Sequence, residues 1–130
     1  MLGITPVIMT NAAGKYLMQM RDNHPGIHFP LKWSFFGGGM EEGETPLETA
    51  RREIFEEIGV QVELEDLQVE GTMEFASHPG RVLHIVRCRK PIEWEMIKLA
   101  EGAGAGYFSA EEIQLIGASE WAKEFAKRFL

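Results

Sequence analysis

The sequence predicts an α/β fold in which helices cover both faces of a mixed β-sheet. Segments with helical periodicity are interspersed with extended, apolar segments. Neighbouring extended segments are mostly joined by turns, and each amphipathic helix needs a sheet or another helix against which to bury its apolar stripe. The length of 130 residues, with 45% hydrophobic and 25% charged residues, suits one domain with a real core. We therefore expect residues 1–130 to form a single domain.

The N-terminal third of the chain is predicted to supply the first strands. Residues 2–9 and 15–20 are apolar and extended, and the turn-forming residues 11–14 between them predict a hairpin. Residues 33–36 predict a further short strand. The three glycines at 37–39 follow it directly and predict a tight turn.

Residues 46–58 carry the clearest helix signals in the sequence. Thr45 is a good N-cap, Pro46 suits the first helical position, and Glu48 completes a capping box with Thr45. Gly59 supplies a C-terminal stop, because glycine tolerates the left-handed backbone that ends many helices. We expect a helix between these two caps.

After this helix the chain is predicted to return to extended structure. Residues 61–67 and 69–76 have extended patterns, and residues 81–89 alternate well enough to form the returning strand. A short extended piece is expected around Trp94. Residues 100–106 are rich in glycine and alanine, which predicts a flexible loop.

Two capping signals predict helices near the C-terminus. Ser109 and Glu112 form a second capping box before a short helix. Ser119 can open a terminal helix, since aromatic residues follow it at four-residue spacing. The aromatic residues of this stripe, which we expect in the core, are Trp121, Phe125 and Phe129.

The helix at 46–58 carries a group of glutamates on one flank. At about 100° per residue, Glu53, Glu56 and Glu57 project within an arc of roughly 100°, beside an apolar stripe. Like charges on neighbouring turns repel by a few tenths of a kcal/mol per pair, and a divalent cation would remove that repulsion. Mg²⁺ and Mn²⁺ prefer such oxygen ligands. The alternative is a solvated acidic helix face, which would be the better interpretation of an isolated glutamate pair.

The spacing of residues around this helix resembles the signature of the Nudix hydrolases. Gly38, Glu44 and the run REIFEEIGV that begins at Arg52 agree with that signature at every defined position. Phe36 is a departure, because many members of the family have proline there. The resemblance implies an α/β/α sandwich with a mixed sheet, and it implies a metal-dependent hydrolase that cleaves a diphosphate bond.

By this resemblance, the substrate is a nucleoside diphosphate derivative, and the products are a nucleoside monophosphate and a second phosphate-bearing fragment. A nucleoside triphosphate is the first candidate, because the chain is compact and lacks an added recognition domain. The alternative is a non-catalytic nucleotide-binding or regulatory domain with the same fold. Such relatives usually lose motif glutamates, whereas this chain has them all.

The resemblance also implies a magnesium site, in which Mn²⁺ can substitute. Glu53 is either a ligand or the base that takes a proton from the attacking water. Gly38 is expected to let the backbone approach the metal closely, since a side chain would block that approach. The residues expected at the metal are Gly38, Glu53, Glu56 and Glu57.

The side chains of one arginine and one further glutamate complete the motif. Arg52 is expected to orient the motif carboxylates through a charge-assisted hydrogen bond to Glu44 or to another of them. We therefore count Arg52, Glu44 and Glu53 as the catalytic group.

Outside the motif, two residues are candidates for contact with substrate. A carboxylate from a later loop often acts in this family, and Glu101 ranks before Glu93 and Glu95 because it precedes the glycine-rich stretch. Arg21, at the end of the second predicted strand, either meets a phosphate or pairs with a nearby carboxylate such as Asp22.

Composition and charge limit the kinds of partner that we expect for this chain. The net charge of −7 and the absence of a long basic run argue against a nucleic-acid polymer as partner. We expect no membrane segment, and the lone Cys88 is expected to be a buried, unreactive thiol. With no signal-peptide pattern at the start, the cytoplasm is the expected compartment, and the sequence leaves a homodimer open.

Overall fold

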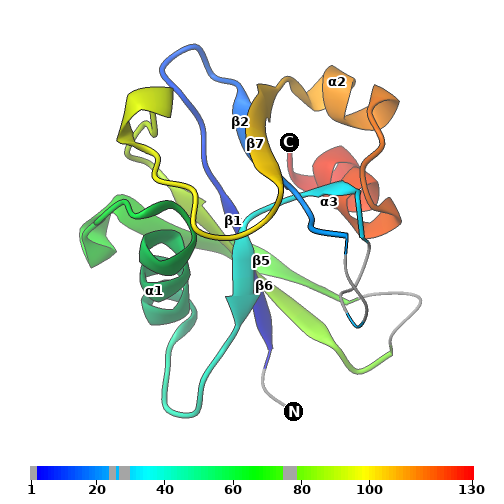
Figure 1. The fold of residues 1–130 in the computed structure, drawn as a ribbon. Helices are drawn as coiled ribbons and strands as arrows, with labels where there is room; N and C mark the ends of the chain where they lie inside the picture. The colour runs from blue at the N-terminus through cyan, green and yellow to red at the C-terminus, as the bar shows by residue number, and fades with distance from the viewer. Residues whose placement is uncertain (1–2, 24–25, 27–29, 75–78) are drawn as a thin grey trace.

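A computed structural model describes residues 3–23, 26, 30–74 and 79–130 of the chain. Within these residues, the chain forms two β-sheets and three α-helices, joined by short 3₁₀ segments (Figure 1). Among the described residues, no helix is both long enough and apolar enough to span a membrane.

Strand β1 (Ile4–Ile8) lies inside a four-stranded mixed sheet. It pairs antiparallel with β4 (Gly37–Gly39) on one side and parallel with β6 (Val82–Cys88) on the other. Strand β5 (Leu67–Glu74) pairs antiparallel with β6 and forms the edge of the sheet. The predicted mixed sheet is confirmed.

A second sheet of three antiparallel strands has the order β3-β2-β7. Its strands are β3 (Trp33–Ser34), β2 (Tyr16–Met20) and β7 (Gly104–Phe108). The predicted hairpin is correct only at its turn, where Thr10 bridges Tyr16. Beyond the turn the two strands diverge into different sheets, because β4 and β6 occupy both edges of β1.

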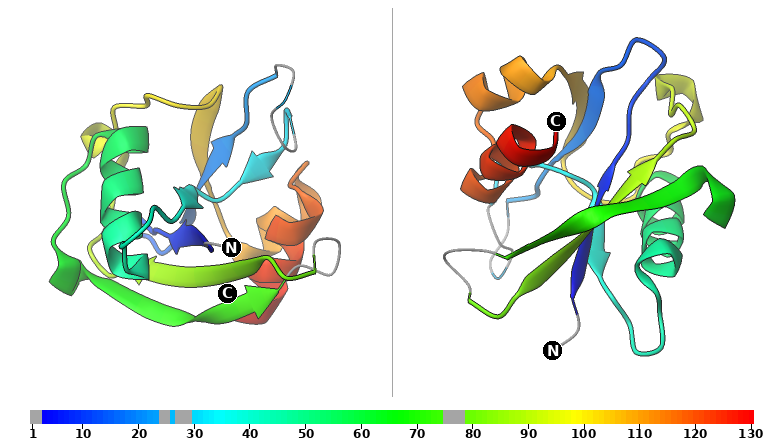
Figure 2. Two further views of the ribbon diagram at one scale, coloured as in Figure 1. Left: turned by 90° about the horizontal axis from the view of Figure 1, so that it is seen from below. Right: turned by 180° about the vertical axis from the view of Figure 1, so that it is seen from behind.

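Helices cover both faces of the mixed sheet, as the sequence predicts (Figure 2). Helix α1 (Pro46–Ile58) packs on one face, and α2 (Ala110–Leu115) with α3 (Glu120–Phe129) lies on the opposite side. The fold is therefore an α/β/α sandwich. The core under α1 includes Val7, Met9, Leu17, Phe36, Ala50, Ile54, Ile58, Val86 and Ile92. The core under α3 includes Ile8, Met18, Phe35, Leu83, Ile85, Ile113 and Phe125.

The predicted helix ends are confirmed. Thr45 caps α1 by accepting the N–H of Glu48, which completes the capping box, and Gly59 ends the helix with φ of 68°. Ser109 forms the same kind of box before α2, and Ser119 is the N-cap of α3. These contacts join neighbours in the chain, so local sequence determines them.

Several predicted boundaries differ from the structure. Trp94 begins a 3₁₀ turn (Trp94–Met96), and Leu64–Asp66 forms another 3₁₀ turn before β5, where extended backbone was predicted. Residues 104–106 belong to β7, because pairing with β2 holds these small residues extended. The predicted ends of two strands, at Leu2 and at residues 75–76, lie outside the described residues.

The glycines at 37–39 form strand β4, so the predicted turn is wrong. The glycines do allow a close approach of other atoms, but the backbone stays extended instead of turning. A Cβ built on Gly37, whose φ is +139°, would lie 2.1 Å from the carbonyl oxygen of Thr5. Glycine is needed there because β4 and β1 approach too closely for any side chain.

We expect Gly37→Ala to destabilise the protein severely, by roughly 3 kcal/mol or more, since the methyl group must displace backbone atoms. Gly39→Ala is the matched control, because a Cβ on Gly39 meets nothing within 4 Å. Chemical denaturation of both variants measures the difference. Equal stability of the two variants would contradict this account of β4.

Candidate metal and active site

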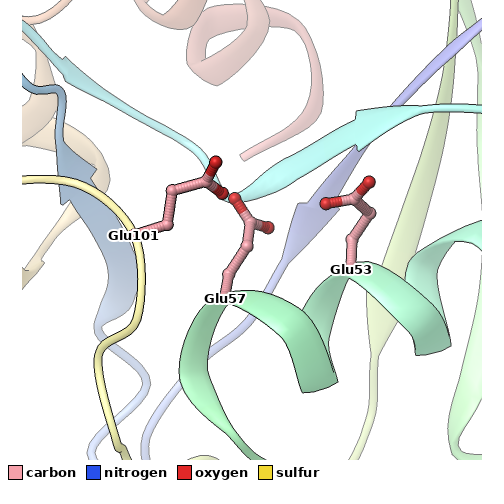
Figure 3. A group of neighbouring side chains, drawn as sticks. All are labelled: Glu53, Glu57 and Glu101. Atoms are coloured by element: carbon pink, nitrogen blue, oxygen red, sulfur yellow. The ribbon is translucent and has the colours of Figure 1, made fainter.

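Three carboxylates converge at the C-terminal half of helix α1 (Figure 3). Glu53 and Glu57 project from successive turns of α1, and Glu101 reaches them from the loop before β7. Each contributes an oxygen, and these oxygens all lie within 4.8 Å of one another. This spacing suits a single ion that binds all three carboxylates.

Strand β4 fixes the two helical glutamates. The carboxylate of Glu53 occupies the space that a side chain at Gly38 would fill, since a Cβ there would lie 2.4 Å from its Oε1. The backbone N–H of Gly37 donates to Oε1 of Glu57 over 2.9 Å. Glycines therefore let the strand run directly beside the acidic flank of the helix.

The last turn of α1 fixes the loop that carries Glu101. The backbone N–H groups of Lys98 and Ala100 donate to the carbonyl oxygens of Ile58 and Glu57, over 2.8 and 2.9 Å. These carbonyls have no partner within the helix, so the loop satisfies groups that the helix leaves open. The same bonds bring Glu101 to the two helical carboxylates.

The cluster is electrostatically unfavourable in the absence of a cation. Glu57 is only 3% exposed, and burial, a hydrogen bond with Glu101 and repulsion from Glu53 raise its pKa to about 9, although the N–H of Gly37 opposes the rise. Burial also raises the pKa of Glu53, against the effect of Arg52. The cluster thus holds a proton at neutral pH, at a place where a cation would relieve the same repulsion.

Arg52 contacts carboxylates on both sides of it. It donates to both oxygens of Glu44, from Nε over 2.7 Å and from Nη2 over 2.9 Å, and its Nη1 donates to Oε1 of Glu53 over 2.9 Å. Nη2 also donates to the carbonyl oxygen of Gly39 over 3.0 Å. These carboxylates raise the pKa of Arg52. The expected hydrogen bond between Arg52 and Glu44 is present.

Glu44 is held by donors on three sides. Besides Arg52, it accepts the hydroxyl of Thr49 over 2.9 Å and the backbone N–H of Glu41 over 2.8 Å. The hydrogen bonds from Arg52, more than any other contact, lower its pKa to about 2. Glu44 is therefore ionised at neutral pH, where it holds the guanidinium of Arg52.

The other predicted residues lie around this centre. Glu56 is outside the carboxylate cluster, with a side chain 57% exposed and 3.3 Å from Nη1 of Arg52. Arg21 directly follows β2, where its backbone pairs with Lys32. Glu93 accepts the N–H of Ala12, at the turn after β1.

Sequence reasoning missed two contributions to the site. One is the N–H of Gly37, and the other is Gln19, a buried residue of β2 whose side-chain amide donates to the carbonyl oxygen of Glu101. A glutamine inside an apolar strand was the available signal for Gln19. The glycine triplet indicated a close backbone approach at Gly37, but the hydrogen bond to Glu57 depends on how β4 packs against α1.

The donor set fits a hard divalent cation. It consists of carboxylate oxygens, and its central member, Glu57, is buried with a raised pKa where a cation would bind. Beside it, an open groove of about 490 Å³ runs along the outer flank of α1. The groove is lined by Glu44, Glu48, Arg51, Arg52, Phe55, Glu56 and Gln61.

Curated relatives match part of the chain. The nucleoside triphosphatase NudI of Enterobacter sp. (strain 638) is 44% identical over 61 residues, a match that takes in 47% of this chain and 41% of that protein. The protein of the same name from Salmonella arizonae is 45% identical over 65 residues, which are 49% of this chain and 43% of the relative. The matches thus span less than half the length of these relatives.

Solved structures share the fold over nearly the whole chain. A MutT structure, from a study of the Aliivibrio salmonicida and Vibrio cholerae proteins, has a TM-score of 0.78 at 21% identity and covers 98% of this chain and 94% of its own. The dihydroneopterin triphosphate pyrophosphohydrolase of E. coli has a TM-score of 0.72 at 22% identity, and the match covers 97% of this chain and 92% of that protein's chain. At these identities the comparison shows the fold alone.

The sequence model of the NUDIX domain matches residues 4–129, which span both sheets, all three helices and the carboxylate cluster. The resemblance found in the sequence around α1 therefore extends over the described structure, and the chain belongs to the NUDIX family.

Proposed function

We propose that this protein hydrolyses the diphosphate bond of a nucleoside diphosphate derivative in a reaction that requires a divalent cation. The observation that carries the proposal is the convergence of Glu53, Glu57 and Glu101, with oxygens within 4.8 Å of one another. A nucleoside triphosphate is the first substrate to test, because the matched relatives are named nucleoside triphosphatases. Water would add to one phosphorus, and the bridging oxygen would leave with the other phosphate.

Glu53, Glu57 and Glu101 would hold the cation, and Gly38 leaves the space that Glu53 needs. We propose Mg²⁺, with Mn²⁺ as a substitute, because both accept carboxylate and phosphate oxygens. When bound, the cation would neutralise the charge on phosphate oxygens and lower the pKa of a water molecule. Glu56 would join it on substrate binding, since its hydrogen bonds from Arg52, over 3.3 and 3.4 Å, are longer than those that Arg52 forms with Glu44 and Glu53.

Two cationic residues have separate proposed roles. Arg52 orients Glu53 while Glu44 holds its guanidinium in place, so the three side chains act as one positioned group. Arg21 lies at the end of β2, and we propose that it binds a phosphate of the substrate. Its neighbour Met20 accepts a hydrogen bond from the backbone of Ala103, which places this strand end beside the loop of Glu101.

The direct test is a panel of diphosphate-bridged compounds, incubated with Mg²⁺ and followed by product analysis. We expect a nucleoside monophosphate and a second phosphate-bearing product, and we expect no turnover when a chelator removes the metal. Nucleotide binding without hydrolysis of any compound would instead identify a non-catalytic nucleotide-binding domain.

We expect Glu53→Gln, Glu56→Gln and Glu57→Gln each to lower kcat by roughly a hundredfold or more, with the fold retained. The amide has nearly the shape of the carboxylate but cannot neutralise a cation. Steady-state kinetics on the best substrate measures the loss. Glu120→Gln is the control, since this exposed glutamate opens α3, away from the cluster. Near-normal rates in all three site variants would rule out the proposed site.

Arg52→Ala should lower both stability and activity. It leaves Glu44 without its main partner, and hydrogen bonds to charged groups contribute roughly 1.5 to 3 kcal/mol each when lost. Arg52→Lys keeps the positive charge but lacks the planar fork, so we expect partial recovery of stability with little recovery of kcat. Denaturation curves and kinetics measured on both variants test the orienting role. A full rate with lysine would contradict it.

Glu57 should make the metal-free protein less stable as pH rises. Its folded pKa of about 9 lies above the value of 4.5 for an ordinary glutamate. Its contribution is therefore complete below about pH 4.5 and is lost progressively up to pH 9, at up to about 1.4 kcal/mol per pH unit. We expect melting temperatures to fall across this window in the wild type, less so in Glu57→Gln, and Mg²⁺ to restore them only in the wild type. Parallel melting profiles of the two proteins would contradict the prediction.

A further inference from the structure

Gln19 is a buried amide in an otherwise apolar strand. Gln19 is 3% exposed, and the two preceding residues of β2, Leu17 and Met18, are also buried but apolar. Burying an amide is unfavourable unless it forms hydrogen bonds, and a hydrophobic side chain could be buried there at a lower cost in free energy. Its Nε2 donates to the carbonyl oxygen of Glu101 over 3.3 Å. The buried amide thus contacts the backbone of the residue that completes the carboxylate cluster.

Gly102 allows this contact. Its φ is +88°, and a Cβ built on it would lie 2.8 Å from both Cγ and Nε2 of Gln19 and 2.9 Å from the carbonyl oxygen of Met20. The loop therefore lies directly on the Gln19 side chain, and only glycine fits between them. Two independent features of the sequence, a buried glutamine and a left-handed glycine, serve the same contact.

The contact lies between two fixed points of the loop. Ala100 donates its N–H to the carbonyl oxygen of Glu57, and Ala103 donates to that of Met20, over 2.9 and 2.8 Å. Between these points, the hydrogen bond from Gln19 turns the carbonyl of Glu101 toward β2. The carboxylate of the same residue points toward Glu57 (Figure 3). The hydrogen bond from Gln19 thus restrains the backbone of the residue whose carboxylate completes the cluster.

We propose that Gln19 is a positioning residue that aims the carboxylate of Glu101 at the cation shared with Glu53 and Glu57. This inference rests on the proposed function, because it assigns Glu101 to the metal. Without the amide, the peptide after Glu101 can rotate, and the third carboxylate is no longer held at the distance that the other two require. Residues that orient metal ligands in this way typically change metal affinity by roughly 10–100-fold.

The test compares Gln19→Met with Gln114→Met. Gln114 is a matched control, since its Nε2 also donates to a backbone carbonyl, that of Lys123, over 3.0 Å, and it joins α2 to α3 away from the site. Mg²⁺ and Mn²⁺ binding are measured by calorimetry without substrate, beside melting temperatures. We expect Gln19→Met to weaken metal binding about tenfold and Gln114→Met to leave it unchanged. Equal metal affinity in both variants would overturn the proposal, whatever their melting temperatures.

A double-mutant cycle with Glu101→Gln separates positioning from a general loss of packing. If Gln19 acts through Glu101, Gln19→Met should weaken metal binding little further in the Glu101→Gln background. A full additional loss there would overturn the proposal. Should Gln19→Met fail to fold, Gln19→Asn carries the same test, because it keeps an amide but is one methylene too short to reach the loop.

The outcome also distinguishes this inference from the proposed function. If the wild type binds no divalent cation and hydrolyses nothing, the proposed function itself is wrong. If the wild type binds and Glu101→Gln does not, but Gln19→Met behaves as the wild type, the metal site stands and only the role of Gln19 is refuted.

Discussion

The close contact between helix α1 and strand β4 is the constraint on which the site depends. Three consecutive glycines let the strand pair with β1 on one side and contact the acidic flank of the helix on the other. Gly37 contributes an N–H to Glu57, and Gly38 leaves room for Glu53. A side chain at Gly38 would collide with the carboxylate of Glu53, and one at Gly37 would collide with the backbone of β1.

The carboxylates proposed to bind the metal make the folded protein less stable in the absence of a cation. Burial raises the pKa values of Glu53 and Glu57, which is an unfavourable contribution to folding at neutral pH. Next to Glu53 on the same helix, Arg52 forms the opposite arrangement with Glu44, which precedes the helix and is held ionised by hydrogen-bond donors. The charges at one end of the network are thus balanced within the protein, whereas the carboxylates at the other end form the site proposed for a cation. This division is typical of functional sites, where optimal stability is given up for binding.

The cluster also joins the two sheets. Glu53 and Glu57 stand on a helix that covers the mixed sheet, and Glu101 comes from a loop that enters the second sheet at β7. Backbone hydrogen bonds fix this loop to the end of helix α1 and to strand β2 of the second sheet. Any motion of one sheet relative to the other would therefore change the spacing of the carboxylates. The same junction explains why a buried residue of β2, Gln19, has a contact with the site.

The sequence by itself determined the features that depend on near neighbours. The caps at Thr45 and Gly59 and the shared flank of Glu53 and Glu57 follow from local hydrogen bonds and the helical period. Its family signature also indicated the α/β/α sandwich. Only the tertiary structure decided that the glycines form a strand, that β1 and β2 separate into two sheets, and that Glu101 meets the helical glutamates. Those outcomes depend on which distant strand occupies each edge and on backbone groups of other segments, and no local pattern specifies them.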